Sequence, residues 1–159
     1  MDQKSLSRWL KIIIIVVAAI GAAGDAFMVR IVGKMIRERY PDLVHLSLPW
    51  MISMWIFSIP CFVALIYAWK VAVEIGRGRP FSVPNASHVK KISYLAFADS
   101  VFFFVVSTAF VLLKLNHFGF ILASVIVVFL GLCAAVAAAV LSHLILKAAL
   151  LQDENDLTI

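Results

Sequence analysis

Residues 115–146, LNHFGFILASVIVVFLGLCAAVAAAVLSHLIL, form the longest run of this chain without an acidic residue, a lysine or an arginine. A helix needs about 20 mostly apolar residues to cross the hydrocarbon core of a bilayer, and this run exceeds that length. We therefore expect a membrane-spanning helix in this segment.

Three further apolar runs precede it in the chain. Residues 43–69 carry no charge, residues 12–29 are interrupted only by Asp25, and residues 92–113 only by Asp99. Each run is long enough to cross a bilayer as a helix. The sequence predicts an all-α fold, an integral membrane four-helix bundle, with spans at about residues 10–29, 47–73, 92–113 and 118–148.

The composition excludes a water-soluble domain. The chain has 159 residues, of which 64% are hydrophobic and 14% are charged, whereas soluble domains are about half apolar and about a quarter charged. We expect residues 1–159 to form a single membrane domain surrounded by membrane lipids. The net charge of +5 then indicates contact with anionic lipid, and we expect no direct binding to nucleic acid.

The distribution of cations predicts which side of the membrane each end occupies. With a cytoplasmic N-terminus, nine of the 14 lysines and arginines lie inside and five outside, as the positive-inside rule favours. We therefore predict cytoplasmic N- and C-termini, a basic cytoplasmic loop at 74–91 and an acidic cytoplasmic tail at 152–159. The inner cations are Lys4, Arg8, Lys11, Lys70, Arg77, Arg79, Lys90, Lys91 and Lys147; the outer ones are Arg30, Lys34, Arg37, Arg39 and Lys114.

Glycine and proline residues mark the ends of the second and third spans. Gly76 and Gly78 suit the C-terminus of a helix, and Pro80 and Pro84 oppose an immediate return into the next helix. Asn85 is a good N-cap residue. We expect it to cap the third span.

Small residues predict which helices pack closely, because the hydrophobic effect does not drive helices together in lipid. The first span offers Gly21 and Gly24, and the fourth offers Gly131, Ala135 and Ala139 at four-residue spacing. We predict contact between the first and fourth spans. The alternative is generic alanine-rich filling with no fixed partner.

Asp25 and Asp99 stand out because a charge deep in a membrane costs several kcal/mol unless it is paired, hydrated or neutralised. Counting about 1.5 Å per residue from the span ends puts Asp99 level with His143, and puts Asp25 level with Lys114 and Arg30. We predict that Asp99 contacts His143 or the hydroxyl beside it. Three roles for the acids stay open: helix–helix contacts, a proton or cation relay, and contact with a ligand.

No catalytic or cofactor motif occurs in the sequence. Residues 76–78 hold a G-x-G fragment, but the third glycine and the preceding strand of a dinucleotide-binding motif are missing. Cys61 and Cys133 lie within apolar runs and are predicted to be packing residues, since no CxxC pair exists. We therefore expect no enzymatic activity, no cofactor and no metal.

Two segments carry a family resemblance. Residues 78–82 read GRPFS and are followed by Asn85, and the chain ends with ENDLTI at residues 154–159. Together with four spans in a short chain, these motifs resemble the domain of unknown function 2975 family of small bacterial membrane proteins. The resemblance covers most of the chain and implies a four-helix bundle in the bacterial cytoplasmic (inner) membrane, with no established activity.

The resemblance also implies a class of partner. Members of the family are often encoded beside a small helix-turn-helix regulator of the Cro type, which implies that the membrane protein regulates or tethers such a cytoplasmic regulator. We expect a non-enzymatic protein with this role, acting alone or as a homo-oligomer. Two alternatives stay open: a small transporter or channel subunit that uses Asp25 or Asp99, and a structural accessory subunit of a membrane complex.

The basic loop and the acidic tail share the predicted cytoplasmic face. They either pair with each other or present a surface to a soluble partner, and we expect the tail to continue as a helix that docks near residues 79–82. Arg77 and Arg79 would then bond to the tail carboxylates. The candidate partner-binding residues are Arg77, Arg79, Phe81, Ser82, Asn85, Lys90, Lys91, Glu154, Asn155, Asp156, Leu157 and Thr158.

Overall fold

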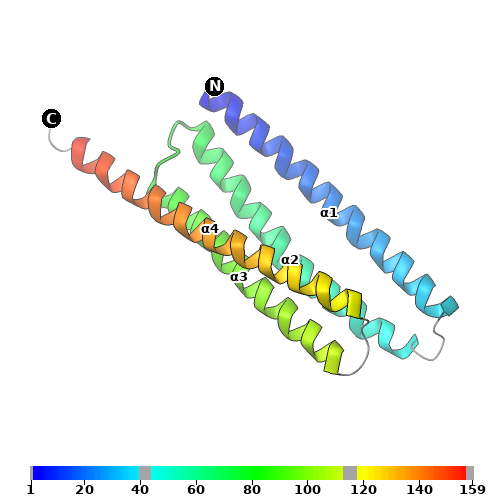
Figure 1. The fold of residues 1–159 in the computed structure, drawn as a ribbon. Helices are drawn as coiled ribbons and strands as arrows, with labels where there is room; N and C mark the ends of the chain where they lie inside the picture. The colour runs from blue at the N-terminus through cyan, green and yellow to red at the C-terminus, as the bar shows by residue number, and fades with distance from the viewer. Residues whose placement is uncertain (1, 40–43, 113–117, 157–159) are drawn as a thin grey trace.

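The computed structural model consists of four long helices, and each of them is long and apolar enough to cross a membrane. It describes residues 2–39, 44–112 and 118–156. The all-α membrane fold with four helices is therefore confirmed. The helices are α1 (Gln3–Arg39), α2 (Val44–Gly76), α3 (Val83–Leu112) and α4 (Phe118–Asp156) (Figure 1).

The four helices alternate in direction, so both ends of the described chain lie at the same end of the bundle (Figure 1). We call this the terminal end. It carries the start of α1, the end of α2, the start of α3, the end of α4 and the connection at residues 77–82. The end of α1, the start of α2, the end of α3 and the start of α4 lie at the opposite end (Figure 1).

Large apolar side chains face outward along all four helices. Ile20 on α1, Trp55 on α2, Phe104 on α3 and Leu130 on α4 are all exposed. A soluble protein rarely exposes so much contiguous apolar surface, whereas a membrane protein presents it to lipid. The chain is a multi-pass membrane protein.

Each helix packs against its neighbours in chain order: α1 on α2, α2 on α3, and α3 on α4. No described Cα atom of α1 comes within 8 Å of one of α4, so the predicted contact between the first and fourth spans is wrong. The small residues of α4 are used against α3 instead, where Gly131 receives Ser100. Gly24 of α1 has no atom of another element within 4 Å of its ideal Cβ position.

Buried serines join α3 to α4. Ser93 Oγ donates a hydrogen bond to the carbonyl of Ala135, and Ser142 Oγ donates one to the carbonyl of Ala86, each at 2.8 Å. Small side chains let the two backbones approach, and a hydroxyl that bonds across the contact holds the register of the helices. The buried small residues of α3 recur every seven positions, at Ala86, Ser93, Ser100 and Ser107.

A similar contact joins α1 to α2 near the terminal end. Ser7 Oγ donates to the carbonyl of Ala72 at 2.6 Å, and it lies so near Gly76 that a Cβ there would be 2.6 Å from it. Gly76 is the last residue of α2, as predicted, and it also lets α1 pack closely against this end of the helix. Gly78, two residues further on, has a positive φ of 80°.

The connection between α2 and α3 is much shorter than predicted. Residues 74–91 do not form a loop, because α2 continues to Gly76 and α3 begins at Val83, so Lys90 and Lys91 lie on a helix. Proline is tolerated in the first turn of a helix, which is why Pro84 does not delay the start of α3.

Ser82, not Asn85, caps α3. Its Oγ accepts a hydrogen bond from the backbone N–H of Asn85 at 3.4 Å, and its carbonyl accepts one from the N–H of Ala86 at 3.0 Å. At the other end of the chain the tail does extend the last helix, because α4 runs to Asp156. Leu157 and Thr158 lie outside the described residues.

The predicted cytoplasmic location of the terminal end is open to a direct test. A single cysteine placed at residue 116, in a chain with Cys61 and Cys133 replaced by serine, should react with a membrane-impermeant maleimide added outside intact cells. The reason is that the cation distribution places the α3–α4 turn outside. A cysteine at residue 155 should react only after the cells are opened. Labelling of residue 155 in intact cells would show that the terminal end faces outward and that the predicted orientation is wrong.

Candidate functional site

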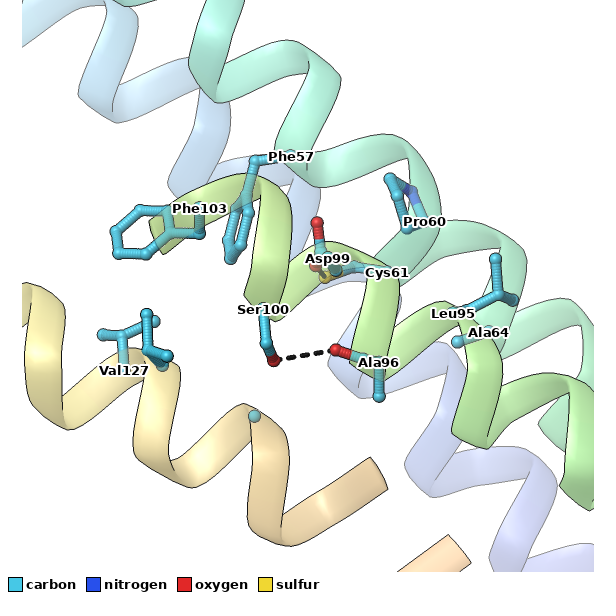
Figure 2. Close-up of a pocket in the computed structure, with 12 residues that line it drawn as sticks. Phe57, Pro60, Cys61, Ala64, Leu95, Ala96, Asp99, Ser100, Phe103 and Val127 are labelled. Carbon is cyan, nitrogen blue, oxygen red and sulfur yellow. Dashed lines mark hydrogen bonds between the residues drawn. The ribbon is translucent and has the colours of Figure 1, made fainter. Parts of the chain in front are cut away.

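The carboxylate of Asp99 is buried within the bundle. Asp99 is 7% exposed, and it extends from α3 toward α2 rather than toward α4 (Figure 2). Its Oδ2 accepts a hydrogen bond from the Cys61 thiol, with Sγ and Oδ2 3.3 Å apart. Its Oδ1 is buried and has no hydrogen-bond partner within the described part of the chain.

A cavity of about 210 Å³ opens beside this carboxylate (Figure 2). Pro60 lies at its edge on α2 and cannot donate the usual helical hydrogen bond to the carbonyl four residues earlier. Apart from Asp99, Cys61 and Ser100, its lining side chains are apolar. The lining includes Phe57, Pro60, Cys61, Asp99, Ser100 and Phe103.

The predicted pairing of Asp99 with His143 or Ser142 is wrong. Ser142 bonds to Ala86 at the start of α3, which lies about 20 Å along that helix from Asp99 at 1.5 Å per residue. His143 is exposed. The buried serine contacts set the axial register of α4 against α3. Counting residues from the predicted ends of the spans does not give this register.

Asp25 lies on a separate face, between α1 and α2. It is partly buried and borders a hollow of about 550 Å³ that is also lined by Arg30, Ser58, Trp55 and Phe62. The predicted neighbour Arg30 therefore borders the same hollow, whereas Lys114 lies outside the described residues. The hollow shares no lining residue with the Asp99 cavity, so the two acids border different cavities.

At the terminal end, the last turn of α2 carries an acid, Glu74, that the sequence analysis did not select as a candidate. The carboxylate of Glu74 pairs with Arg77 at 2.9 Å and with Arg79 at 3.5 Å. The backbone N–H of Arg79 also donates to the carbonyl of Glu74 at 3.1 Å, around Gly78. Glu74 thus gives both arginines a partner within their own segment. The sequence did contain a sign of this contact: Glu74 lies one helical turn before Arg77 and Arg79, and the glycines between them mark the end of a helix.

Asn85 holds the connection against the start of α3. It is 1% exposed, and its Nδ2 donates to the carbonyl of Pro80 at 2.7 Å. Its Oδ1 is buried without a partner among the described residues. The Asn85 side chain therefore holds residues 77–82 against α3 through a buried hydrogen bond. It is not available at the surface to bind a partner directly.

The connection and the end of α4 line one pocket. This pocket, which we call the loop–tail pocket, has a volume of about 380 Å³ and is bordered by Gln3, residues 78–82, Ala149, Gln152 and Asp153. The described part of the tail, residues 152–156, is helical as predicted, and Gln152 and Asp153 border the pocket together with residues 78–82. Phe81 at the pocket and Leu151 nearby on α4 are 55% and 66% exposed.

Lysines and aromatic rings form a belt at the level where the bundle leaves the apolar region. Lys70 and Lys91 place their Nζ atoms 5.1 Å and 5.2 Å from the centre of the Tyr67 ring. Lys90 lies 5.7 Å from the Tyr94 ring in the same way. Such cation–π contacts suit the headgroup region of a membrane, so Lys90 and Lys91 contribute to this belt and not to a loop.

Comparison with known proteins agrees with the family resemblance. The model of a protein family described as "Protein of unknown function (DUF2975)" matches residues 31–159. The chain belongs to this family. A relative in Bacillus subtilis (strain 168), "Uncharacterized membrane protein YoaS", is 28% identical over 153 residues, which cover 95% of this chain and 96% of that protein. No solved structure matches the chain.

The segment that matches the DUF2975 family contains most of the residues described above as candidate functional residues. It covers α2, α3 and α4, and with them Glu74, Asn85, Asp99 and the loop–tail pocket except for Gln3. Asp25 and most of α1 precede the matched segment.

Metal binding has no support in the part of the chain that the structure describes. Within these residues, no three histidine, cysteine, aspartate or glutamate side chains gather closely enough to hold an ion. Cys61 and Asp99 come together as a pair only. Nothing in the sequence marked Cys61 as the neighbour of Asp99, because it lies in an uncharged run on a different helix.

Proposed function

We propose that this protein is a non-enzymatic protein of the bacterial inner membrane that binds a soluble cytoplasmic partner, such as a small helix-turn-helix regulator, at the loop–tail pocket. One observation carries the proposal. Residues 78–82, one of the two segments that carry the family resemblance, border the same pocket as Gln152 and Asp153, which directly precede the other segment, residues 154–159.

The chemistry of this pocket suits a soluble protein partner. It combines the exposed ring of Phe81 with the charged side chains of Arg79 and Asp153. Protein interfaces commonly place an apolar or aromatic centre within a polar rim. The Glu74 pairs and the Asn85 hydrogen bond hold the connection in a defined shape, which lowers the cost of ordering it on binding.

A small transporter or channel subunit is the second candidate, because Asp25 and Asp99 each border a hollow. The two hollows share no lining residue, so a transport pathway would use one acid or the other, and neither hollow includes residues 78–82 or the tail that carry the family resemblance. The partner-binding function is therefore the better supported of the two.

Affinity capture from native membranes tests the proposal. We expect the full chain to retain a cytoplasmic protein, and a chain ending at Leu151 or carrying Phe81→Glu to lose it by about tenfold or more, since a central aromatic contact often supplies 2 kcal/mol or more. Leu122→Ala, an exposed position toward the other end of α4, is the matched control and should capture as the native chain does.

Membrane insertion should be the same in all of these variants, because the truncation and Phe81→Glu lie outside the apolar runs and Leu122→Ala keeps its run apolar. Equal capture by the native chain and the chain ending at Leu151 would contradict the proposal. So would loss of capture in Leu122→Ala to the same extent as in Phe81→Glu.

A further inference from the structure

A larger cavity adjoins the one beside Asp99. A second cavity of about 400 Å³ lies between α2 and α3 and is bordered at its edges by α1 and α4. The two cavities have Phe57, Phe103 and Val127 in common as lining residues. The two cavities are therefore adjacent, and we call them together the compartment, with Asp99 in the lining of its smaller part.

The larger part of this compartment is apolar and aromatic. Phe57 and Phe103 pack with ring centres 4.9 Å apart and planes inclined at 47°. Its polar groups are two serines, and Ser53 already donates its hydroxyl hydrogen bond to the carbonyl of Pro49 on its own helix. The lining includes Phe57, Phe102, Phe103, Phe110, Met28 and Met54. A molecule that fits here must have an apolar body.

The smaller part of the compartment contains a polar group, the carboxylate of Asp99. Asp99 is more than nine-tenths buried, and its Oδ1 has no partner in the described part of the chain. No described lysine, arginine or histidine forms an ion pair with it. A buried carboxylate oxygen without a partner costs free energy, and a bound donor with positive charge would remove that cost.

We propose that this compartment binds an amphipathic organic ammonium compound, with its apolar body between α2 and α3 and its ammonium group on Oδ1 of Asp99. The rings of Phe57 and Phe103, which line both parts, offer aromatic faces to the cation. The compartment is within the usual size range of small-molecule sites, about 300–1,000 Å³. This inference is independent of the proposed partner at the loop–tail pocket.

The chemistry of the lining discriminates against other ligands. A sugar or a phosphate ester would find too few hydrogen-bonding groups along Phe102, Phe103 and Phe110, and an anion would meet a carboxylate. A neutral acyl chain would fill the apolar part and leave Oδ1 of Asp99 without a partner. Charge complementarity therefore selects the cation.

Binding of two matched probes tests the proposal. The full chain is reconstituted in phosphatidylcholine nanodiscs, and binding of 4-phenylbutylammonium and of its neutral analogue 4-phenylbutan-1-ol is measured by equilibrium dialysis, with empty nanodiscs as the background. We expect the ammonium probe to bind about tenfold or more tightly than the alcohol, because a hydrogen bond to a charged group contributes about 1.5–3 kcal/mol.

Variants separate the carboxylate from the apolar wall. Asp99→Asn should weaken the ammonium probe by about tenfold or more and leave the alcohol unchanged, which also reports that the compartment is intact. Asp99→Glu should retain a preference for the cation, and Phe103→Leu should weaken the ammonium probe through loss of an aromatic face. Asp25→Asn, an acid beside the other hollow, is the control and should bind within about twofold of the native chain.

Several results would overturn the proposal. They are equal binding of the ammonium and the alcohol, no binding above empty nanodiscs, unchanged ammonium binding in Asp99→Asn, or an equal loss in Asp25→Asn. If Asp99→Asn fails to fold, the other three variants decide. The proposal requires that Asp99→Glu keep the preference for the ammonium probe and that Phe103→Leu bind this probe more weakly than Asp25→Asn does; the opposite result in either variant contradicts it.

Discussion

Gly131→Leu is expected to separate α3 from α4 and to lower the free energy of unfolding by about 1–3 kcal/mol or more, the usual cost of overpacking. A Cβ at position 131 would overlap the hydroxyl of Ser100. That hydroxyl is already committed to the carbonyl of Ala96 at 2.7 Å, so it cannot turn away without losing a bond. A longer side chain must therefore push the helices apart.

The effect should spread along the contact. The bonds of Ser93 to Ala135 and of Ser142 to Ala86 lie on the same side of α3 as Ser100, and both need the two backbones to stay close. Interhelical hydrogen bonds in membranes contribute about 0.6 kcal/mol each on average, so their loss adds to the cost of overpacking.

Gly24→Leu is the matched control for this prediction. Both glycines lie within membrane helices, but the ideal Cβ position of Gly24 has nothing within 4 Å. Leucine there would face lipid and improve helix propensity over glycine, so stability should stay the same or rise slightly. Thermal unfolding followed by circular dichroism in nanodiscs measures both. Equal destabilisation by the two substitutions would refute the assignment of Gly131 to a close helix contact.

Asn85→Ala is expected to release the connection between α2 and α3. The substitution removes the Nδ2 donor from the carbonyl of Pro80, and a buried acceptor without its donor costs about 1–3 kcal/mol. The peptide bond after Arg77 should then become accessible to trypsin. We expect its cleavage in detergent to accelerate by about tenfold, since local opening of a segment rises with the loss of its contacts. Electrophoresis of timed digests gives the rate.

Ser87→Ala is a suitable control for Asn85→Ala, because Ser87 is two residues further along α3 and is exposed. Its cleavage rate should equal that of the native chain. If Asn85→Ala is cleaved no faster than Ser87→Ala, then Asn85 does not hold the connection. If it is cleaved faster, the same variant should also capture less of the cytoplasmic partner, because residues 78–82 line the loop–tail pocket.

The sequence alone determined the class of the protein and the number of its helices. Long apolar runs have one stable form in a bilayer, a helix that satisfies its own backbone hydrogen bonds, so residues 115–146 needed no tertiary information. The position of Asp99 within such a run also marked it as a residue of interest, since its cost in lipid depends on the run around it. The motifs at residues 78–82 and 154–159 pointed to the family.

The sequence did not determine where helices end outside the apolar runs. The charged residues Glu74, Lys90 and Lys91 end a hydrophobic pattern, but a helix continues into water because its hydrogen bonds remain internal. The true limits come from local chemistry: the positive φ of Gly78 ends α2 and Ser82 caps α3.

Only the tertiary structure decided which residues meet. The small residues of α1 suggested a partner for α4, and the heptad of buried small residues from Ala86 to Ser107 on α3 was recognised only in the structure. The choice between them depends on how hydroxyl groups and backbones fit once the helices lie together, as at Ser93 and Ala135. The same contacts fix the level of α4 against α3, and they leave Asp99 facing Cys61 on α2 rather than His143. Depth along one helix is a property of the sequence, whereas the facing residue depends on the register between two helices.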